Sequence, residues 1–383
     1  FILGANAQGK STLLEAAYLL AIAKSYRINT ERELIHRDAL QKTDALTGGS
    51  PIRPDRSGLS TPTGRGMSEA PSDRAGFGSG QALITGDAEV REGHLRVIVG
   101  LQATAGEGGS GWLVKKQIRV NGVATTASGL VGRLNAVLFT ATDIDLTYGS
   151  PSVRRRFLDI LISQADRTYL RSLQRYQRVV TQRNHLLRLI RDGRGSREEL
   201  DFWDTELVKE GVAIITRRDQ VIGKLAPLAI QAYAGLVGGQ EELSLVFQPA
   251  VPAPGLEEAL REQREREVAA GMTLSGPHRD DLALEVEGMS AAIYASRGQA
   301  RIIALALRLA EALFLKEARG EEPVLLLDDV FSELDPQRRT TTALTLCEAE
   351  QVILTTADPE SVPGELPSPT ATFRVAAGSL ERI

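Results

Sequence analysis

The stretch Gly4-Ala5-Asn6-Ala7-Gln8-Gly9-Lys10-Ser11 decides how the rest of this sequence is interpreted. It matches the phosphate-binding pattern G-x-x-x-x-G-K-[ST]. Before it stand apolar residues 1–3, typical of the end of a buried strand, and after it residues 11–24, which are rich in helix-forming Leu, Ala and Glu. Glycines in such a loop let backbone N–H groups turn towards phosphate oxygens, and the helix start adds its positive dipole end. The alternative, a chance glycine-rich turn, would not require these flanking elements.

The pattern gives each polar residue of this loop a role. We expect Lys10 to contact the β- and γ-phosphates of a nucleoside triphosphate and the hydroxyl of Ser11 to bind Mg²⁺. Because residues 1–3 look like the end of a strand whose beginning is absent, we also expect further residues before Phe1. The residues predicted to contact the nucleotide here are Gly4, Ala5, Asn6, Ala7, Gln8, Gly9, Lys10, Ser11 and Thr12.

A second stretch, Leu325-Leu326-Leu327-Asp328-Asp329, ends an apolar run that predicts a strand buried on both faces. Such a strand would place Asp328 beside the phosphate loop, where it can hold Mg²⁺ through water, and Asp329 where it can orient or deprotonate an attacking water. Two uncompensated carboxylates close to a core are costly, and a bound cation removes that cost. The alternative is that both acids face solvent beyond the strand end.

Two shorter motifs accompany the acid pair. Ser296-Arg297-Gly298-Gln299 precedes an apolar helical stretch and predicts an anion-binding helix start, although a plain helix cap would look the same. Ser332-Glu333-Leu334-Asp335 follows the acids. The order of phosphate loop, S-x-G-Q, strand with acid pair and S-x-L-D is that of ABC-type ATPases, so we expect an α/β fold with a P-loop ATPase head.

Composition excludes several classes of protein. The chain has 383 residues, a formal net charge of −4 and one cysteine, Cys347, which excludes an internal disulfide framework and a cysteine-rich zinc site. Its longest apolar stretch, residues 302–315, contains Arg308 and Glu311 and is too short to cross a bilayer. There is no secretory signal. We therefore expect a cytoplasmic protein without a membrane partner. The four histidines lack metal-ligand spacing, and for His278 we expect a structural hydrogen-bonding role.

The pattern along the chain indicates a divided head. Residues 83–139 alternate as in antiparallel strands, with a type I′ hairpin signal at Asn121-Gly122, whereas residues from 152 to about 234 have a helical pattern. Strands return after residue 275. We therefore predict a head made of residues 1–145 and 275–383 around a helical arm of residues 146–274. Residues 41–82, rich in Gly, Ser, Pro and Thr, are interpreted as a mobile insertion in the head.

The predicted arm carries a concentration of arginine. Of the 45 cationic residues 37 are arginine, a bias that a GC-rich genome explains as well as phosphate recognition does. Residues 150–197 contain twelve arginines against three acids. At 100° per residue Arg171, Arg175 and Arg178 share one helical face, which suits binding to the phosphates of DNA without reading its sequence. A solvated helix face is the alternative.

Longer strings make a more specific comparison possible. From residue 1 to about 358, apart from 41–82, the sequence resembles the RecF family of bacterial recombination mediators, in the SMC branch of ABC-type ATPases. The strings that carry this resemblance are Glu33-Leu34-Ile35, Ser150-Pro151-Ser152-Val153-Arg154-Arg155-Arg156-Phe157-Leu158-Asp159, Gln182-Arg183-Asn184, Ser275-Gly276-Pro277-His278-Arg279-Asp280-Asp281-Leu282 and Leu326-Leu327-Asp328-Asp329-Val330-Phe331-Ser332-Glu333-Leu334-Asp335.

The resemblance implies a homodimer that encloses ATP between two heads. Lys10, Ser11 and Asp328 of one subunit would face Ser296 and Gly298 of the other, with Gln299 and Asp335 also at the nucleotide. Asp329 stands where transporters usually have Glu, which implies slow hydrolysis. Thr142 stands where the family usually has Glu, which puts any role of that loop in doubt. Thr355 and Thr356 occupy the position of the transporters' switch histidine and are candidates for sensing the γ-phosphate.

The resemblance also implies partners and a biological role. It implies a weak, DNA-stimulated ATPase that binds double-stranded DNA near single-strand gaps and, with RecR and RecO, assists the loading of RecA during recombinational repair, replication restart and the SOS response. Two alternatives stay open. One is a structural SMC-like DNA clamp with little hydrolysis; the other, the nucleotide-binding subunit of a transporter, is disfavoured by the arginine-rich insertion and the absence of L-S-G-G-Q.

Overall fold

A computed structural model describes residues 1–27, 31–35, 81–105 and 112–383. The predicted insertion, residues 41–82, lies outside the described residues except for Gln81 and Ala82, which begin a strand. In the described part the helices are α1 (Lys10–Ile22), α3 (Ala127–Leu130), α4 (Asp145–Tyr148), α5 (Pro151–Ala165), α6 (Arg167–Arg191), α7 (Glu199–Val237), α8 (Leu256–Ala270), α9 (Ala291–Tyr294), α10 (Arg297–Arg319) and α11 (Pro336–Leu346).

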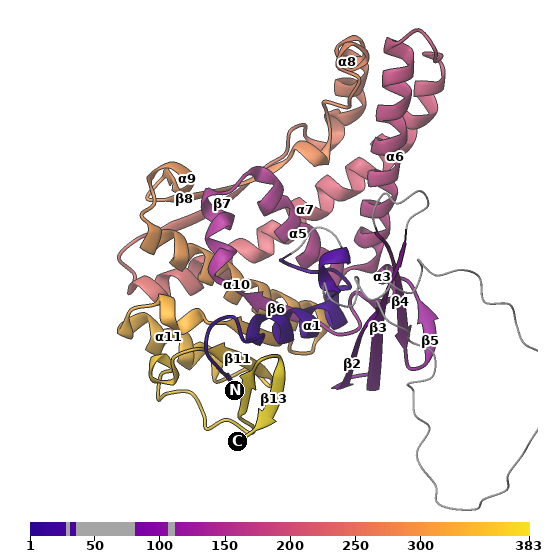
Figure 1. Ribbon diagram of the computed structural model, residues 1–383. Coiled ribbons are helices and arrows are strands. Elements are labelled where there is room, and N and C mark those ends of the chain that lie inside the picture. Colours follow the sequence, from indigo (N-terminus) through magenta and orange to yellow (C-terminus); the bar gives the residue numbers. More distant parts are fainter. Residues whose placement is uncertain (28–30, 36–80, 106–111) are drawn as a thin grey trace, which may run out of the picture.

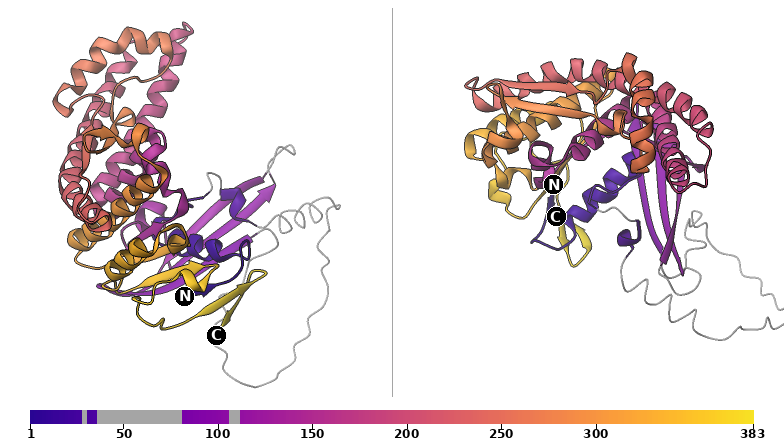
Figure 2. Two further views of the ribbon diagram at one scale, coloured as in Figure 1. Left: turned by 90° about the vertical axis from the view of Figure 1, so that its left-hand side faces the viewer. Right: turned by 90° about the horizontal axis from the view of Figure 1, so that it is seen from above.

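The central sheet joins the two ends of the chain (Figures 1 and 2). Leu3 pairs with Thr356 on one side and with Arg374 on the other, both in parallel register, so the first strand lies inside the sheet. The strand predicted at residues 324–327 is confirmed and lies between two parallel neighbours. Among the described residues the sheet has the order β13-β12-β1-β11-β10-β6, with strands β1 (Ile2–Leu3), β6 (Ala136–Phe139), β10 (Val324–Asp328), β11 (Val352–Thr356), β12 (Phe373–Ala376) and β13 (Ser379–Arg382).

Helices cover both faces of this sheet because side chains alternate along its strands. Leu326 of β10 belongs to the same buried cluster as Leu14 and Tyr18 of α1. Its neighbours Leu325 and Leu327 belong to the cluster that contains the buried face of α10. The strand is therefore buried on both faces, as its apolar run predicts, and α1 and α10 lie on opposite sides of it.

A separate antiparallel sheet lies beside the end of α1 (Figure 1). Asn121 and Gly122 have φ angles of 49° and 80° and connect β4 to β5, so the predicted type I′ hairpin is confirmed. The sheet has the order β2-β3-β4-β5, with strands β2 (Gln81–Val90), β3 (Gly93–Ala105), β4 (Trp112–Val120) and β5 (Val123–Thr125).

Helices α5 to α8 form the predicted helical region. Helices α6 and α8 extend away from the central sheet (Figure 1), whereas α7 also packs along α10. The helical pattern missed one strand here. Strand β7 (Leu243–Gln248) pairs antiparallel with β8 (Asp281–Val286), which in turn pairs with β9 (Met289–Ser290). A small sheet thus connects a strand from the predicted arm to one from the predicted head.

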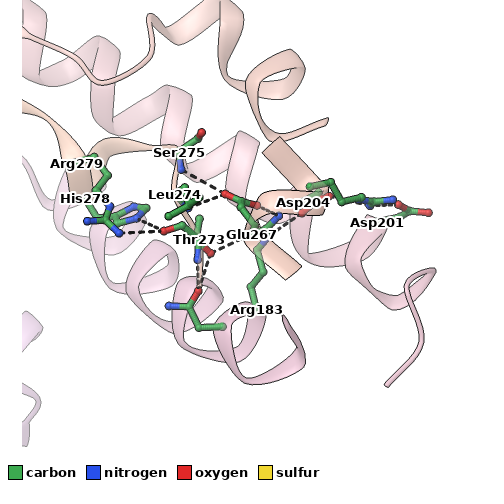
Figure 3. A network of polar contacts seen from close by, with 11 residues as sticks. Arg183, Asp201, Asp204, Glu267, Thr273, Leu274, Ser275, His278 and Arg279 are labelled. Carbon is green, nitrogen blue, oxygen red and sulfur yellow. Dashed lines mark hydrogen bonds and ion pairs between the residues drawn. The ribbon is translucent and has the colours of Figure 1, made fainter. Parts of the chain in front are cut away.

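Two of the family strings meet in a buried polar cluster (Figure 3). Arg183 of the Gln182-Arg183-Asn184 string is fully buried, and it contacts Asp204 at 2.7 Å and Glu267 at 2.6 Å. Its Nη1 donates to Thr273 Oγ1 at 2.9 Å, and the backbone oxygen of Thr273 contacts Nε2 of His278 at 3.2 Å. The contacts fix α6 to α7, α8 and the chain entering β8.

No helix in the described ranges has the length and apolar character needed to span a bilayer.

Candidate nucleotide-binding site and basic helix

The loop between β1 and α1 has the backbone that the phosphate pattern requires. Ala7 and Gly9 have φ angles of 63° and 109°, and no side chain caps the first turn of α1, which leaves early N–H groups available to an anion. A Cβ atom on Gly4 would lie 2.5 Å from the carbonyl oxygen of Val375, so a side chain cannot be accommodated there. Lys10 is 7% exposed, and its Nζ donates to the carbonyl oxygens of Gly4 at 2.7 Å and Ala5 at 2.9 Å.

The acid of β10 meets the phosphate loop through Ser11, 317 residues away in the sequence. Ser11 Oγ donates to Asp328 Oδ1 at 2.9 Å, and Thr355 Oγ1 donates to the same oxygen at 2.9 Å. The Tyr26 hydroxyl donates to Asp328 Oδ2 at 3.3 Å. Burial and the neighbouring Asp328 raise the pKa of Tyr26, so its hydroxyl stays protonated and acts as a donor.

The oxygens of Ser11 and Asp328 suit Mg²⁺ in chemistry and in number. Mg²⁺ prefers oxygen ligands and is usually held by one or two carboxylates together with substrate phosphates and water. The described residues contain no cluster of three or more His, Cys, Asp or Glu side chains that could hold a metal ion without such help. This donor set therefore fits a metal that arrives with a nucleotide.

Asp329 stands at a sharp turn directly after the strand. Its φ angle is 53°, in the left-handed region, where aspartate is better tolerated than most residues. Its N–H donates to the carbonyl oxygen of Thr355 at 3.1 Å, and its Oδ1 accepts from Thr356 Oγ1 at 3.4 Å. Thr355 and Thr356 are both buried against the acid pair. The sequence did not predict these contacts with the two aspartates.

The S-x-G-Q motif begins α10 as a complete capping box. Ser296 Oγ accepts from the N–H of Gln299 at 3.2 Å, and Gln299 Oε1 accepts from the N–H of Ser296 at 2.9 Å. Gln299 also donates to Glu241 at 3.0 Å, whereas Ser296 and Gly298 are exposed. Among the described contacts, those of this motif do not reach residues 4–12. The motif therefore caps α10 within this chain. Any contact of the motif with a nucleotide would use the exposed side of Ser296 and Gly298.

Asp335 also caps a helix, α11. Its Oδ1 accepts from the N–H of Arg338 at 3.1 Å and its Oδ2 from the Arg338 guanidinium at 2.9 Å. The bond from the Arg338 N–H, followed by the guanidinium charge, lowers the pKa of Asp335. Within one chain this residue therefore has a structural contact that accounts for it.

The basic face predicted on α6 is present. Arg171, Arg175 and Arg178 are exposed, and Tyr176 on another face of the helix is buried. Arg175 lies 3.4 Å from Glu210, a weak ion pair. The count of twelve arginines overstates the free charge of this region, because several of them, such as Arg154 with Asp281 and Arg183 with Glu267, are buried in ion pairs.

His278 has the structural role expected of it. Its Nδ1 accepts from the Tyr176 hydroxyl at 2.6 Å, and its Nε2 donates to the carbonyl oxygen of Thr273 at 3.2 Å; a carbonyl can only accept, which fixes the tautomer. Burial lowers the pKa of His278 to about 4, so the ring is neutral at neutral pH.

Sequence reasoning missed Tyr26 altogether. The residue follows α1 by four positions, and no pattern in the sequence marks it as a partner of a carboxylate 302 residues away.

A mainly parallel sheet carrying a phosphate loop after β1 and an acid pair after β10, together with an S-x-G-Q capping box at the start of α10, defines an ABC-type ATPase head. Comparison with models of protein families gives no match. Curated proteins named DNA replication and repair protein RecF do match: the one from Herpetosiphon aurantiacus is 38% identical over 359 residues, covering 92% of this chain and 86% of the relative. The chain therefore belongs to the RecF family.

Other comparisons agree with this assignment. The RecF protein of Bacillus subtilis is 32% identical over 390 residues, covering 99% of this chain and 92% of the relative. A solved structure of the recombination mediator protein RecF with ATP is similar over all of this chain and 90% of the other, with a TM-score of 0.79 and 26% identity. Membership in this family excludes the transporter alternative.

Proposed function

We propose that this chain is a DNA-binding ATPase of recombinational repair and replication, working as an ATP-dependent homodimer in the cytoplasm. The hydrogen bond between Ser11 and Asp328 carries the proposal, because it brings the phosphate loop and the acid pair together at the carboxyl ends of β1 and β10. A related structure is of the recombination mediator protein RecF with ATP, and that protein acts in the RecFOR pathway.

Each residue of the nucleotide site has a proposed task. Lys10 and the amide groups of residues 4–12 would bind the phosphates, and Ser11 with Asp328 would hold Mg²⁺, which neutralises phosphate charge. Thr355 and Tyr26 would orient Asp328 by donating their hydroxyl groups to its carboxylate. Asp329 would orient or deprotonate the attacking water. Thr356, which contacts Asp329, would position that acid. Thr355 and Thr356 would respond to the γ-phosphate through the carboxylates of Asp328 and Asp329.

The second half of the site would come from another subunit. Ser296 and Gly298 are exposed at the start of α10, and Gln299 and Asp335 lie in the two motifs that face the partner's nucleotide in the proposed dimer. Two large apolar side chains precede this helix start and are exposed: Ile293 is 72% exposed and Tyr294 66% exposed. Exposed apolar groups of this kind favour burial against another protein surface.

Arg171, Arg175 and Arg178 are the proposed contacts with the DNA backbone, with double-stranded DNA near gaps as the substrate. RecR, acting with RecO, would be the protein partner, and RecA loading the outcome. Replacing all three arginines with Gln should reduce the magnitude of the slope of log K against log salt by up to about 2.7, which is about 0.9 for each lost phosphate contact. Arg261→Gln on α8, where the arginine is exposed and paired with Glu258, is the matched control.

One measurement separates this proposal from the structural clamp with little hydrolysis. Steady-state ATP hydrolysis should be slow in the free protein and should increase when duplex DNA is added. A protein that binds DNA and ATP but does not hydrolyse ATP above background under either condition is the clamp instead.

A further inference from the structure

A cavity of about 570 Å³ lies where the head meets the helical region. Its walls come from the end of α1, from α3, and from helices α5, α6 and α7. It is separate from the nucleotide site, because the residues that line it include neither the phosphate loop nor the acid pair.

The charges on the walls of this cavity are unbalanced. Lys24, Arg155 and Arg156 line it, and in the described part of the chain none of the three has a carboxylate within ion-pair distance. The acid among the lining residues is Asp159, and it is already paired with Arg218 at 2.8 Å. The three cations therefore present positive charge that no direct ion pair in the described residues neutralises and that an added anion would stabilise.

The two arginines are also only partly satisfied as hydrogen-bond donors. Arg155 Nη1 donates to the carbonyl oxygen of Asp280 at 2.7 Å, and Arg156 Nη2 donates to that of Ser25 at 2.9 Å. A guanidinium has five N–H groups, so each arginine keeps donors for another acceptor. Burial lowers the pKa of Arg155 and the charge of Arg218 lowers it further, against the opposing effect of Asp281, Asp159 and Asp280, so a bound anion would stabilise this cation.

The cavity continues towards the basic face of α6. Gln174, Gln177 and Thr181 line it, and the same three residues line a neighbouring hollow together with Arg178. Amide and hydroxyl side chains between two groups of cations are typical of surfaces that follow a sugar-phosphate backbone.

We propose that this cavity binds the phosphodiester backbone of a nucleic-acid strand through Lys24, Arg155 and Arg156, and that the segment after α1 transmits this binding to the nucleotide site. The proposal rests on the DNA-binding function proposed above and names the surface where one strand enters.

The connecting segment is short. Arg156 holds the carbonyl oxygen of Ser25, whose hydroxyl donates to Glu15 on α1. The next residue, Tyr26, donates to Asp328 Oδ2 and contacts the carbonyl oxygen of Ser11 at 3.5 Å. A phosphate bound by the remaining N–H groups of Arg156 repositions the guanidinium and the Ser25 carbonyl that it holds, and thereby shifts Tyr26 relative to Asp328. Coupling between two binding sites is reciprocal, so ATP must change DNA affinity by the same factor as DNA changes ATP affinity.

The binding half of the proposal is tested with the double variant Lys24→Gln, Arg155→Gln and a labelled duplex. The loss of two phosphate contacts should reduce the magnitude of the negative slope of log K against log salt by about 1.8. Binding of a fluorescent ATP analogue without DNA should stay at the parental value, which shows that the variant is folded. Arg261→Gln serves again as the control. Parental duplex affinity and slope in the double variant would overturn the assignment.

Two further outcomes separate the sources of failure. If calorimetry shows that the double variant loses binding of inorganic phosphate but keeps duplex binding, the cavity is a free-anion site and the nucleic-acid assignment is wrong. If the parent chain itself does not bind duplex DNA, the proposed function fails as well. If the parent binds duplex DNA and the double variant binds it equally well, only this inference is rejected.

The coupling half is tested with Tyr26→Phe, which removes one hydroxyl. The factor by which DNA changes ATP affinity, taken relative to the variant's own ATP affinity without DNA, should fall towards one. An unchanged coupling factor in Tyr26→Phe would show that the signal does not pass through this segment.

Discussion

Replacement of Arg183 by Met should destabilise the helical region far more than its position on a basic helix suggests. The guanidinium is fully buried and joins Glu267, also fully buried, to Asp204 and Thr273 (Figure 3). Removing it leaves the carboxylate of Glu267 with two backbone donors, the N–H groups of Leu274 at 2.7 Å and Ser275 at 3.4 Å, and no counter-ion.

The size of the effect follows from these contacts. Breaking a buried ion pair by removing one partner costs about 3–5 kcal/mol, because a buried charge is left uncompensated. Asp204 keeps Arg264 at 2.9 Å, so most of the loss arises at Glu267. Replacing both partners with Met removes the stranded charge, and such apolar replacements are often close to neutral. The double variant should therefore be more stable than the single one.

Urea unfolding followed by tryptophan fluorescence measures this directly. Trp203 packs beside Leu186, Leu200 and Val268 near the buried pair, and Trp112→Phe leaves it as the sole reporter. Arg188→Met, at an exposed position of the same helix, is the control and should change the free energy of unfolding by less than about 0.5 kcal/mol. A double variant less stable than Arg183→Met would refute the reasoning, since it would mean that Glu267 is not stranded by loss of the arginine.

Three further predictions concern the nucleotide site and pH. Lys10→Met should weaken ATP binding by about 10- to 100-fold or more, because one charged hydrogen-bonding group is lost. An unchanged ATP affinity in an equilibrium binding assay would reject the phosphate-loop assignment. Asp329→Asn should retain ATP binding while hydrolysis falls about 10²- to 10⁴-fold; equal hydrolysis would remove Asp329 from that role. His278 has a folded pKa of about 4 against 6.5 unfolded, so its stabilisation is complete above pH 6.5 and is lost as the pH falls towards 4. Between pH 7 and pH 5 the parent should lose about 2 kcal/mol more than His278→Gln in urea unfolding, and identical pH slopes would contradict this.

Local patterns predicted the features that depend on neighbouring residues. The phosphate loop, the strand ending in Asp328 and the Asn121-Gly122 hairpin each depend on a few consecutive residues whose backbone preferences are strong. The membership of β1 in a sheet with β11 and β12 was not visible in this way, since the pairing joins residues more than 350 positions apart.

The order of the motifs predicted that Asp328 lies beside the phosphate loop, but most other partners across long sequence separations could not be predicted. A count of charges does not reveal that Arg183 is buried with Glu267, or that Thr355 and Tyr26 both donate to Asp328. Strand β7 was missed because it is short and adjoins helical sequence, and its pairing with β8 depends on tertiary contacts. The division into head and arm at residues 145 and 275 and the roles of the site residues stay predictions.

The central claim is that two chains complete each nucleotide site, and the mass of the protein in solution tests it most directly. Light scattering with ATP, Mg²⁺ and duplex DNA should show the parent moving from 41.4 kDa towards twice that mass. Ser296→Arg should bind ATP as the parent does but stay monomeric, because a bulky cation replaces the small exposed hydroxyl that would face the partner in the proposed dimer. Ser196→Arg, in the loop between α6 and α7, should dimerise normally. Normal ATP-dependent dimerisation by Ser296→Arg would show that its motif is only a helix cap and would contradict the account.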